Sequence, residues 1–200
     1  FNPFLVIFAI VLSIMASYTA LDMFTLIKTS VKNKRFLFIG GTFSMGIGIW
    51  IMNFMGLLAG DLSRFADYQV PMTILSLIIG ISFTGMAFYA LIGRNVKLAH
   101  LLIGSFFLTL AVISIHILGM YAINMDLHFQ PFIFVLSVFI IFGSFLISIW
   151  MVFHPKNFMS GNQSWLKPVS ALIITGAIVE GHFLLKRATS FNLNSQPNTP

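Results

Sequence analysis

Six runs of about 20 apolar residues, separated by short polar segments, decide what this chain can fold into. A helical run of that length rises 1.5 Å per residue and crosses a hydrocarbon layer of about 30 Å. Of the 200 residues, 58% are hydrophobic and 8% are charged, and the mean hydropathy of +0.97 excludes an ordinary soluble domain. The sequence therefore predicts an all-α, polytopic membrane bundle of six transmembrane helices. We place them at residues 4–25, 36–59, 71–92, 101–124, 131–153 and 168–185.

The basic residues are distributed unevenly among the loops. Because cytoplasmic loops carry an excess of Lys and Arg, this asymmetry predicts a multi-pass protein of the cell membrane with its N-terminus outside. The net charge of +6 is then a topology signal, and we expect no nucleic-acid partner. In the loops on the opposite side of the membrane, the basic residue is Arg64. The loops predicted to be cytoplasmic, at 28–35, 93–100 and 154–167, hold Lys28, Lys32, Lys34, Arg35, Arg94, Lys97, Lys156 and Lys167.

An internal repeat relates the helices in pairs. The phrase IMNFMGLLAG at 51–60 returns as SIHILGMYAI at 114–123, and Asn53 precedes His116 by 63 residues, as His116 precedes His182 by 66. The period is one two-helix hairpin, so the chain predicts three parallel repeats about a pseudo-threefold axis. Asn53, His116 and His182 are then expected to converge beneath the external surface.

These three positions and the methionines near them are the candidate metal site. Polar side chains at membrane depth are functional candidates by default. His116 and Met120 share one helical face, and imidazole with thioether is a ligand set that favours copper, especially Cu(I). The alternative is that the methionines only fill gaps between helices. The predicted ligands are His116, Met120, His182, Met52, Asn53 and Met55.

The other polar residues within the spans are expected to stabilise helix packing. No catalytic motif is visible in the sequence, so we expect no enzyme activity from these residues. Ser13, Ser76 and Ser137 are expected to bond a backbone carbonyl one turn earlier in their own helices. The chain contains no cysteine, which excludes a disulfide framework and a thiolate metal site.

The repeats resemble the MHYT domain, a bacterial membrane sensor named for a Met-His-Tyr-Thr motif that occurs three times. The resemblance covers residues 1–188 and leaves 189–200 as a polar tail or linker. It implies six spans with the motif residues near the outer face, copper binding, and sensing of oxygen, carbon monoxide or nitric oxide. It also implies a cytoplasmic output domain, such as a GGDEF, EAL or kinase domain. The matching segments are NPFLV at 2–6, SYTALD at 17–22, GGTFSMGIGIW at 40–50 and the two repeated phrases.

The motif is altered in each repeat. Asn53 replaces the first histidine, the second repeat keeps His116 and Met120, and the third keeps His182 but has Lys186 where a later Met is expected. An amide is a poor Cu(I) ligand, so Asn53 is the weakest member of the set. The alternatives are a small transporter or channel subunit, a structural module without metal, and a haem site with two axial histidines. A seventh span or an output domain beyond residue 200 would favour signalling.

Overall fold

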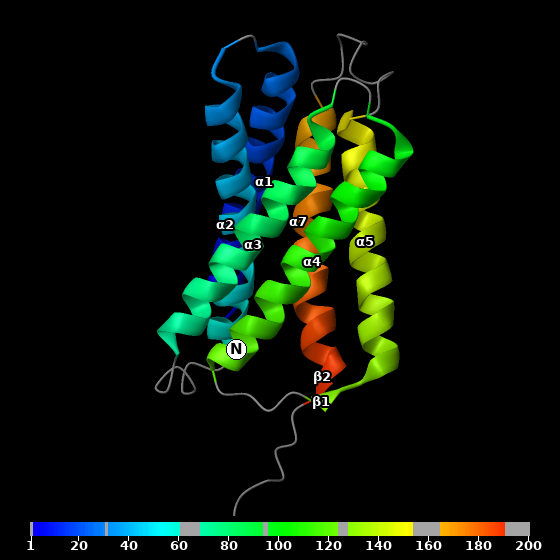
Figure 1. The fold of residues 1–200 in the computed structure, drawn as a ribbon. Coiled ribbons are helices and arrows are strands. Elements are labelled where there is room, and N and C mark those ends of the chain that lie inside the picture. The colour runs from blue at the N-terminus through cyan, green and yellow to red at the C-terminus, as the bar shows by residue number, and fades with distance from the viewer. Residues whose placement is uncertain are drawn as a thin grey trace, which may run out of the picture.

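The computed structural model describes residues 2–30, 32–60, 69–93, 96–123, 128–153 and 165–190. Within these ranges six helices run side by side, and each is long and apolar enough to cross a membrane (Figure 1). The predicted all-α bundle of six spans is confirmed, and the chain is a multi-pass membrane protein. The helices are α1 (Pro3–Thr29), α2 (Lys34–Gly60), α3 (Val70–Leu91), α4 (Leu98–Ala122), α5 (Pro131–Phe153) and α7 (Leu166–Ala188), and the two strands are β1 (His128–Phe129) and β2 (Thr189–Ser190).

The helices extend past the apolar runs that predict them. α1 ends at Thr29, four residues later than expected, and α7 begins two residues earlier than expected. Hydropathy marks the hydrocarbon layer, whereas a helix continues into the polar interface on either side of it. At the start of α1, the side chain of Asn2 accepts a hydrogen bond from the N–H of Phe4 at 3.1 Å, and Pro3 occupies a position where no N–H is needed. Asn124, expected in the fourth span, lies outside the described residues.

One backbone hydrogen bond closes each hairpin at the same end of the bundle. In every repeat, an amide residue just before the first helix donates its N–H to the carbonyl of an alanine at the end of the second helix. In the third hairpin this bond continues into the pairing of β1 with β2, so that Thr189 and Ser190 of the predicted tail are part of a short sheet. The pairs are Asn2 with Ala59 (2.9 Å), Gln69 with Ala122 (2.8 Å) and Gln130 with Ala188 (2.7 Å).

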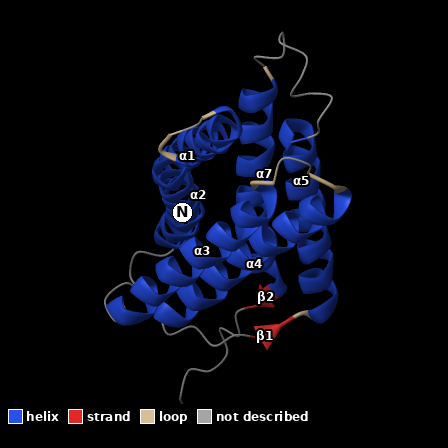
Figure 2. Ribbon diagram, turned by 45° about the horizontal axis from the view of Figure 1, so that its top comes forward, coloured by secondary structure: helices blue, strands red, loops and turns tan. Residues whose placement is uncertain are grey.

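The three hairpins, α1–α2, α3–α4 and α5–α7, form a closed ring. α3 packs against α2, α5 packs against α4, and α1 packs against α7, so each hairpin contacts the next in the same way (Figure 2). α2, α4 and α7 also contact one another and are more buried than α1, α3 and α5. This is the pseudo-threefold arrangement that the repeat predicts, and the second helix of each hairpin lines its centre.

Small residues and hydroxyls hold neighbouring helices close together. A β-carbon at Gly48 would lie 2.7 Å from the β-carbon of Ala16, so glycine is needed where α1 and α2 touch. The expectation for Ser13 was wrong, because its hydroxyl crosses this contact and donates to the carbonyl of Gly48 at 2.8 Å. Ser76 and Ser137 behave as expected and donate to carbonyls three and four residues earlier in their own helices, each at 2.7 Å.

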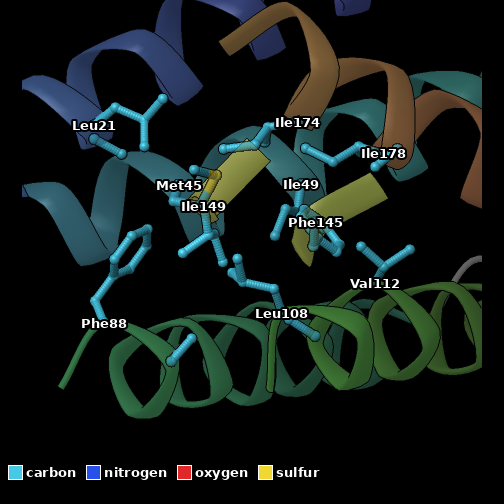
Figure 3. Close-up of a cluster of buried hydrophobic side chains, with 14 of the residues drawn as sticks. Leu21, Met45, Ile49, Phe88, Leu108, Val112, Phe145, Ile149, Ile174 and Ile178 are labelled. Carbon is cyan, nitrogen blue, oxygen red and sulfur yellow. The ribbon is translucent and has the colours of Figure 1, made fainter. Parts of the chain in front are cut away.

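The core fills the centre of the bundle with apolar side chains from all six helices (Figure 3). In the layer drawn there, α2, α4 and α7 each contribute two residues spaced four apart, which places them on one helical face. The labelled residues are Leu21, Met45, Ile49, Phe88, Leu108, Val112, Phe145, Ile149, Ile174 and Ile178.

Candidate functional site

α2, α4 and α7 place one polar residue each at the same level. This level lies between the apolar core layer of Figure 3 and the end of the bundle that carries the strands β1 and β2. Asn53, His116 and His182 are 7%, 1% and 2% exposed, respectively, and all three belong to one cluster. Four residues earlier, each of these helices contributes an apolar side chain, and eight residues earlier it contributes a second one. We call these two apolar layers the floor of the site. The first layer is Ile49, Val112 and Ile178, and the second is Met45, Leu108 and Ile174.

The amide of Asn53 organises both imidazoles. Its Nδ2 donates to the carbonyl of Ile115 at 3.2 Å, which fixes the orientation of the amide and leaves Oδ1 as an acceptor. Nδ1–H of His116 donates to this Oδ1 at 3.0 Å, and Nδ1–H of His182 donates to the same atom at 3.3 Å. Since an amide oxygen cannot donate, both imidazoles must carry a hydrogen on Nδ1.

The other nitrogen of each ring has no such partner. The rings of His116 and His182 meet edge to face, with centroids 5.5 Å apart and planes at 77°. Within the part of the chain that the structure describes, Nε2 of each ring is buried and has no hydrogen-bond partner. In a neutral imidazole whose hydrogen is on Nδ1, Nε2 carries a free lone pair. Leaving a buried polar atom unpaired costs about 1–3 kcal/mol, so two of them at one level make this cluster a candidate binding site.

Two glycines make room for this cluster. A β-carbon at Gly56 would lie 2.5 Å from Nε2 of His182, and one at Gly119 would lie 2.5 Å from Nδ2 of Asn53. Each glycine follows the site residue of its own helix by three positions and faces the side chain of another helix. Sequence reasoning missed these residues as parts of the site, although the glycine shared by both repeated phrases was the available signal. In the third repeat the corresponding residue is Leu185.

A small cavity lies inside the cluster. Its volume is about 10 Å³, which has room for about one water-sized group. The residues around it do not fit a haem, because a porphyrin ring is many times larger than this space. The cavity is lined by the three site residues and by the first floor layer, Ile49, Val112 and Ile178.

The predicted methionine ligands do not line this cavity. Met52 and Met120 are fully buried, and Met55 is half-buried against the core. The cavity lining in the described residues contains no methionine. No group of three or more His, Cys, Asp or Glu side chains suited to a metal is found across the described ranges. The structure thus brings together Asn53, His116 and His182 and does not place the predicted thioethers in the cavity lining.

An ion pair joins α1 and α7 at the opposite end of the bundle. Nζ of Lys167 lies 2.6 Å from Oδ1 of Asp22, and both side chains are partly exposed. Lys167 belongs to the loop 154–167 that the sequence predicts to be cytoplasmic, so the ion pair lies at that end of the bundle. α7 therefore carries His182 near one end and a link to α1 near the other.

Comparison with protein families matches part of the chain to a signalling repeat. Residues 46–104 fit the family MHYT, described as a bacterial signalling protein N-terminal repeat. The matched residues include Asn53 and its glycine Gly56 and extend into α4. The resemblance seen in the sequence motifs is thereby confirmed.

Curated relatives align with nearly the whole chain. The bifunctional diguanylate cyclase/cyclic di-GMP phosphodiesterase MucR of Pseudomonas aeruginosa is 31% identical over 98% of this chain and 29% of its own length. The cyclic di-GMP phosphodiesterase NbdA of the same organism is 29% identical over 92% of the chain and 24% of its own length. The signaling protein YkoW of Bacillus subtilis is 26% identical over 98% of the chain and 25% of its own length. The chain thus spans about a quarter of the length of these relatives, and no solved structure matches it.

Proposed function

Because residues 46–104 carry the MHYT repeat and the chain aligns with one part of longer signalling proteins, we propose that it is the sensing module of a membrane signalling protein. Two of these relatives are named for making or degrading cyclic di-GMP, and the chain matches about a quarter of each. We assign the catalytic steps to an output domain or partner in the cytoplasm and a non-catalytic, sensing role to these helices. The basic loops support a topology with the N-terminus and the site at the outer face.

The input proposed for this module is copper, or a diatomic gas bound by copper. The single observation that carries it is the pair of buried, unpaired Nε2 atoms on His116 and His182. Neutral imidazole nitrogen is a good ligand for copper, and thioethers favour Cu(I). The two imidazoles would hold the ion, and Met120, Met52 and Met55, on the same helices as His116 and Asn53, are the proposed thioether donors. Bound copper would supply a redox-active centre able to take oxygen, carbon monoxide or nitric oxide.

Asn53 contributes to this proposal as an orienting residue. Histidines that bind metals commonly donate the hydrogen of their other ring nitrogen to a nearby acceptor, which fixes tautomer and orientation. Oδ1 of Asn53 is placed to do this for both rings, at 3.0 and 3.3 Å. The amide that would be a weak copper ligand is thus well suited to hold two stronger ligands in the same tautomer.

Movement of α7 offers a route from the site to the other end of the bundle. His182 is held by α2 through Asn53, and Lys167, at the other end of α7, is tied to Asp22 of α1. Binding that changes how α7 sits against α2 would also change this link. We propose that the relative positions of α7 and α1 distinguish the signalling states.

The floor of the site favours sensing over transport. A substrate entering at His116 and His182 would next meet the layer of Ile49, Val112 and Ile178 and then that of Met45, Leu108 and Ile174. A polar solute would have to be desolvated through two consecutive apolar layers. A ligand that binds above this floor and returns to the same side requires no such passage.

The test is a competition titration of the detergent-purified protein against a chromogenic Cu(I) chelator under reducing conditions. His116→Ala and His182→Ala should each abolish specific copper binding. Asn53→Leu keeps both imidazoles but removes their shared acceptor, and loss of such an orienting residue should weaken binding by about 10- to 100-fold. Leu118→Ala, on α4 near His116, is the matched control and should bind as the wild type does.

Three results would contradict the proposal. Wild-type protein that fails to compete with the chelator would remove copper as the input. Equal affinity in wild type and His116→Ala would show that copper binds elsewhere. A variant with unchanged copper affinity but lost output in a full-length signalling protein would show that these residues transmit a signal without binding the ion.

A further inference from the structure

A groove at the end of the bundle opposite the strands β1 and β2 combines two basic side chains with an apolar lining. It has a volume of about 330 Å³ and lies where α1 ends, α2 begins and α3 ends. Figure 1 places these three termini at the end opposite the strands β1 and β2. Its basic residues are Lys34 and Arg35, and its apolar lining consists of Ile27, Phe38, Ile39, Tyr89 and Ile92.

The apolar part of the groove opens toward the membrane side of the bundle. Ile39 and Tyr89 are 54% and 77% exposed, so these two lining side chains are left uncovered by the other helices. Phe38 forms its inner wall and is held there by an edge-to-face contact with Phe24, with ring centroids 6.1 Å apart. A volume near 330 Å³ is at the lower end of small-molecule sites and suits a segment of an extended hydrocarbon chain.

The charged part of the groove is suited to an anion. Lys34 and Arg35 form the first turn of α2, where unpaired backbone N–H groups and the helix dipole also favour negative charge. Within the described ranges the acidic residues are Asp22 and Glu180, and neither forms an ion pair with Lys34 or Arg35. Asn33 has φ of 66° and turns the chain sharply just before them, which presents both side chains at the start of the helix.

We propose that this groove binds one anionic phospholipid from the surrounding bilayer. The lipid phosphate lies between Lys34 and Arg35, and the upper part of one acyl chain lies against Phe38, Ile39 and Tyr89. A soluble anion would use only the charges, and a neutral lipid would use only the apolar wall. An anionic phospholipid uses both and is present at the membrane surface where helix ends lie. The groove is formed by α1, α2 and α3, so the lipid links the first hairpin to the second.

The test measures lipid preference by native mass spectrometry of the purified protein in micelles with equal amounts of phosphatidylglycerol and phosphatidylcholine. Wild-type protein should retain one phosphatidylglycerol in preference to phosphatidylcholine. The double variant Lys34→Gln/Arg35→Gln should lose this preference by about 30-fold, the factor that corresponds to about 1 kcal/mol for each of two basic residues. The matched control Lys32→Gln/Lys97→Gln removes the same charge from the same end without lining the groove, and it should keep the preference.

A second variant tests the apolar half of the site. Ile39→Trp keeps both cations but fills the groove, and it should reduce retention of both lipids. If Lys34→Gln/Arg35→Gln does not fold, the single variants Lys34→Gln and Arg35→Gln replace it, each with an expected loss of about 5-fold. Far-UV circular dichroism verifies the helical content of every variant.

Several outcomes would overturn the proposal. Equal retention of the two lipids by wild type would show that the headgroup is not recognised. An equal loss in the control double variant would mean that only general surface charge acts. Displacement of the lipid by millimolar inorganic phosphate would show an anion site without a lipid requirement. Unchanged binding by Ile39→Trp would exclude the acyl chain from the groove.

Discussion

Replacing Gly56 by alanine tests whether the imidazole of His182 is held in a single position. The new β-carbon would lie 2.5 Å from Nε2 of that ring and 2.8 Å from its Cδ2 and Cε1 atoms. Real β-carbons do not approach other heavy atoms so closely, so the ring must move. It is confined by the hydrogen bond to Asn53 and by edge-to-face contacts with His116 and Phe183.

The size of the effect follows from three contributions. Overpacking of a filled core costs about 1–3 kcal/mol. If the ring turns away from Asn53, a buried hydrogen bond is lost, which costs about 1–3 kcal/mol more. Alanine gains about 1 kcal/mol over glycine in a helix interior. The free energy of unfolding of Gly56→Ala should therefore fall by about 1–5 kcal/mol, and binding of copper at His182 should be lost.

The matched control is Gly143→Ala in α5. A β-carbon there would meet no heavy atom within 4 Å, so only the helix-forming contribution applies and the free energy of unfolding should rise by up to about 1 kcal/mol. Both variants are compared with wild type by denaturant-induced unfolding in mixed micelles, followed by far-UV circular dichroism. Opposite signs for the two variants are the expected result. If Gly56→Ala were as stable as Gly143→Ala and bound copper normally, the ring of His182 would not be confined as described.

Two further predictions concern the opposite end of the bundle and its orientation. The ion pair between Asp22 and Lys167 is partly exposed. A double-mutant cycle with Asp22→Asn and Lys167→Met should therefore give a coupling energy of no more than about 1 kcal/mol. A coupling energy of several kcal/mol would show that the pair is shielded from water. The asymmetry of basic residues predicts that Gln130→Cys reacts with a membrane-impermeant thiol reagent in intact cells and that Ser30→Cys does not. Labelling of position 30 alone would show that the topology is the reverse of the predicted one.

Much of the fold follows from the sequence because hydrophobicity and repetition are strong signals in a membrane protein. Lipid leaves the backbone few alternatives to helices, so six apolar runs predict six spans. The repeat of Asn53, His116 and His182 at intervals of 63 and 66 residues places them at equal depth. The helix ends were less predictable, because interfacial residues such as Thr29 add to a helix without adding hydropathy. The cross-helix bond of Ser13 was missed because it depends on a contact between two helices at Gly48.

The roles of individual site residues could be predicted only in part. Convergence of the three helices requires only the period, whereas hydrogen-bond direction depends on atoms that the sequence does not place. The orientation of Asn53 is fixed by the carbonyl of Ile115, which any residue could supply. The space for the ring of His182 is supplied by Gly56, which belongs to another helix. The sequence around His182 therefore does not show that this space exists. The convergence of these three side chains is thus predictable from the sequence, whereas their orientation requires the fold.

The exchange of histidine for asparagine in the first repeat changes what the site can do. An amide oxygen has two acceptor lone pairs, whereas a neutral imidazole has a single acceptor nitrogen. Asn53 can therefore accept from His116 and His182 at once, whereas an imidazole in its place could accept from only one of them. The amide makes the two remaining rings equivalent, with Nδ1 satisfied and Nε2 free on each. Asn53 gives up one potential ligand and, in return, fixes the tautomer of the other two imidazoles, so that each would offer Nε2 to the proposed copper ion.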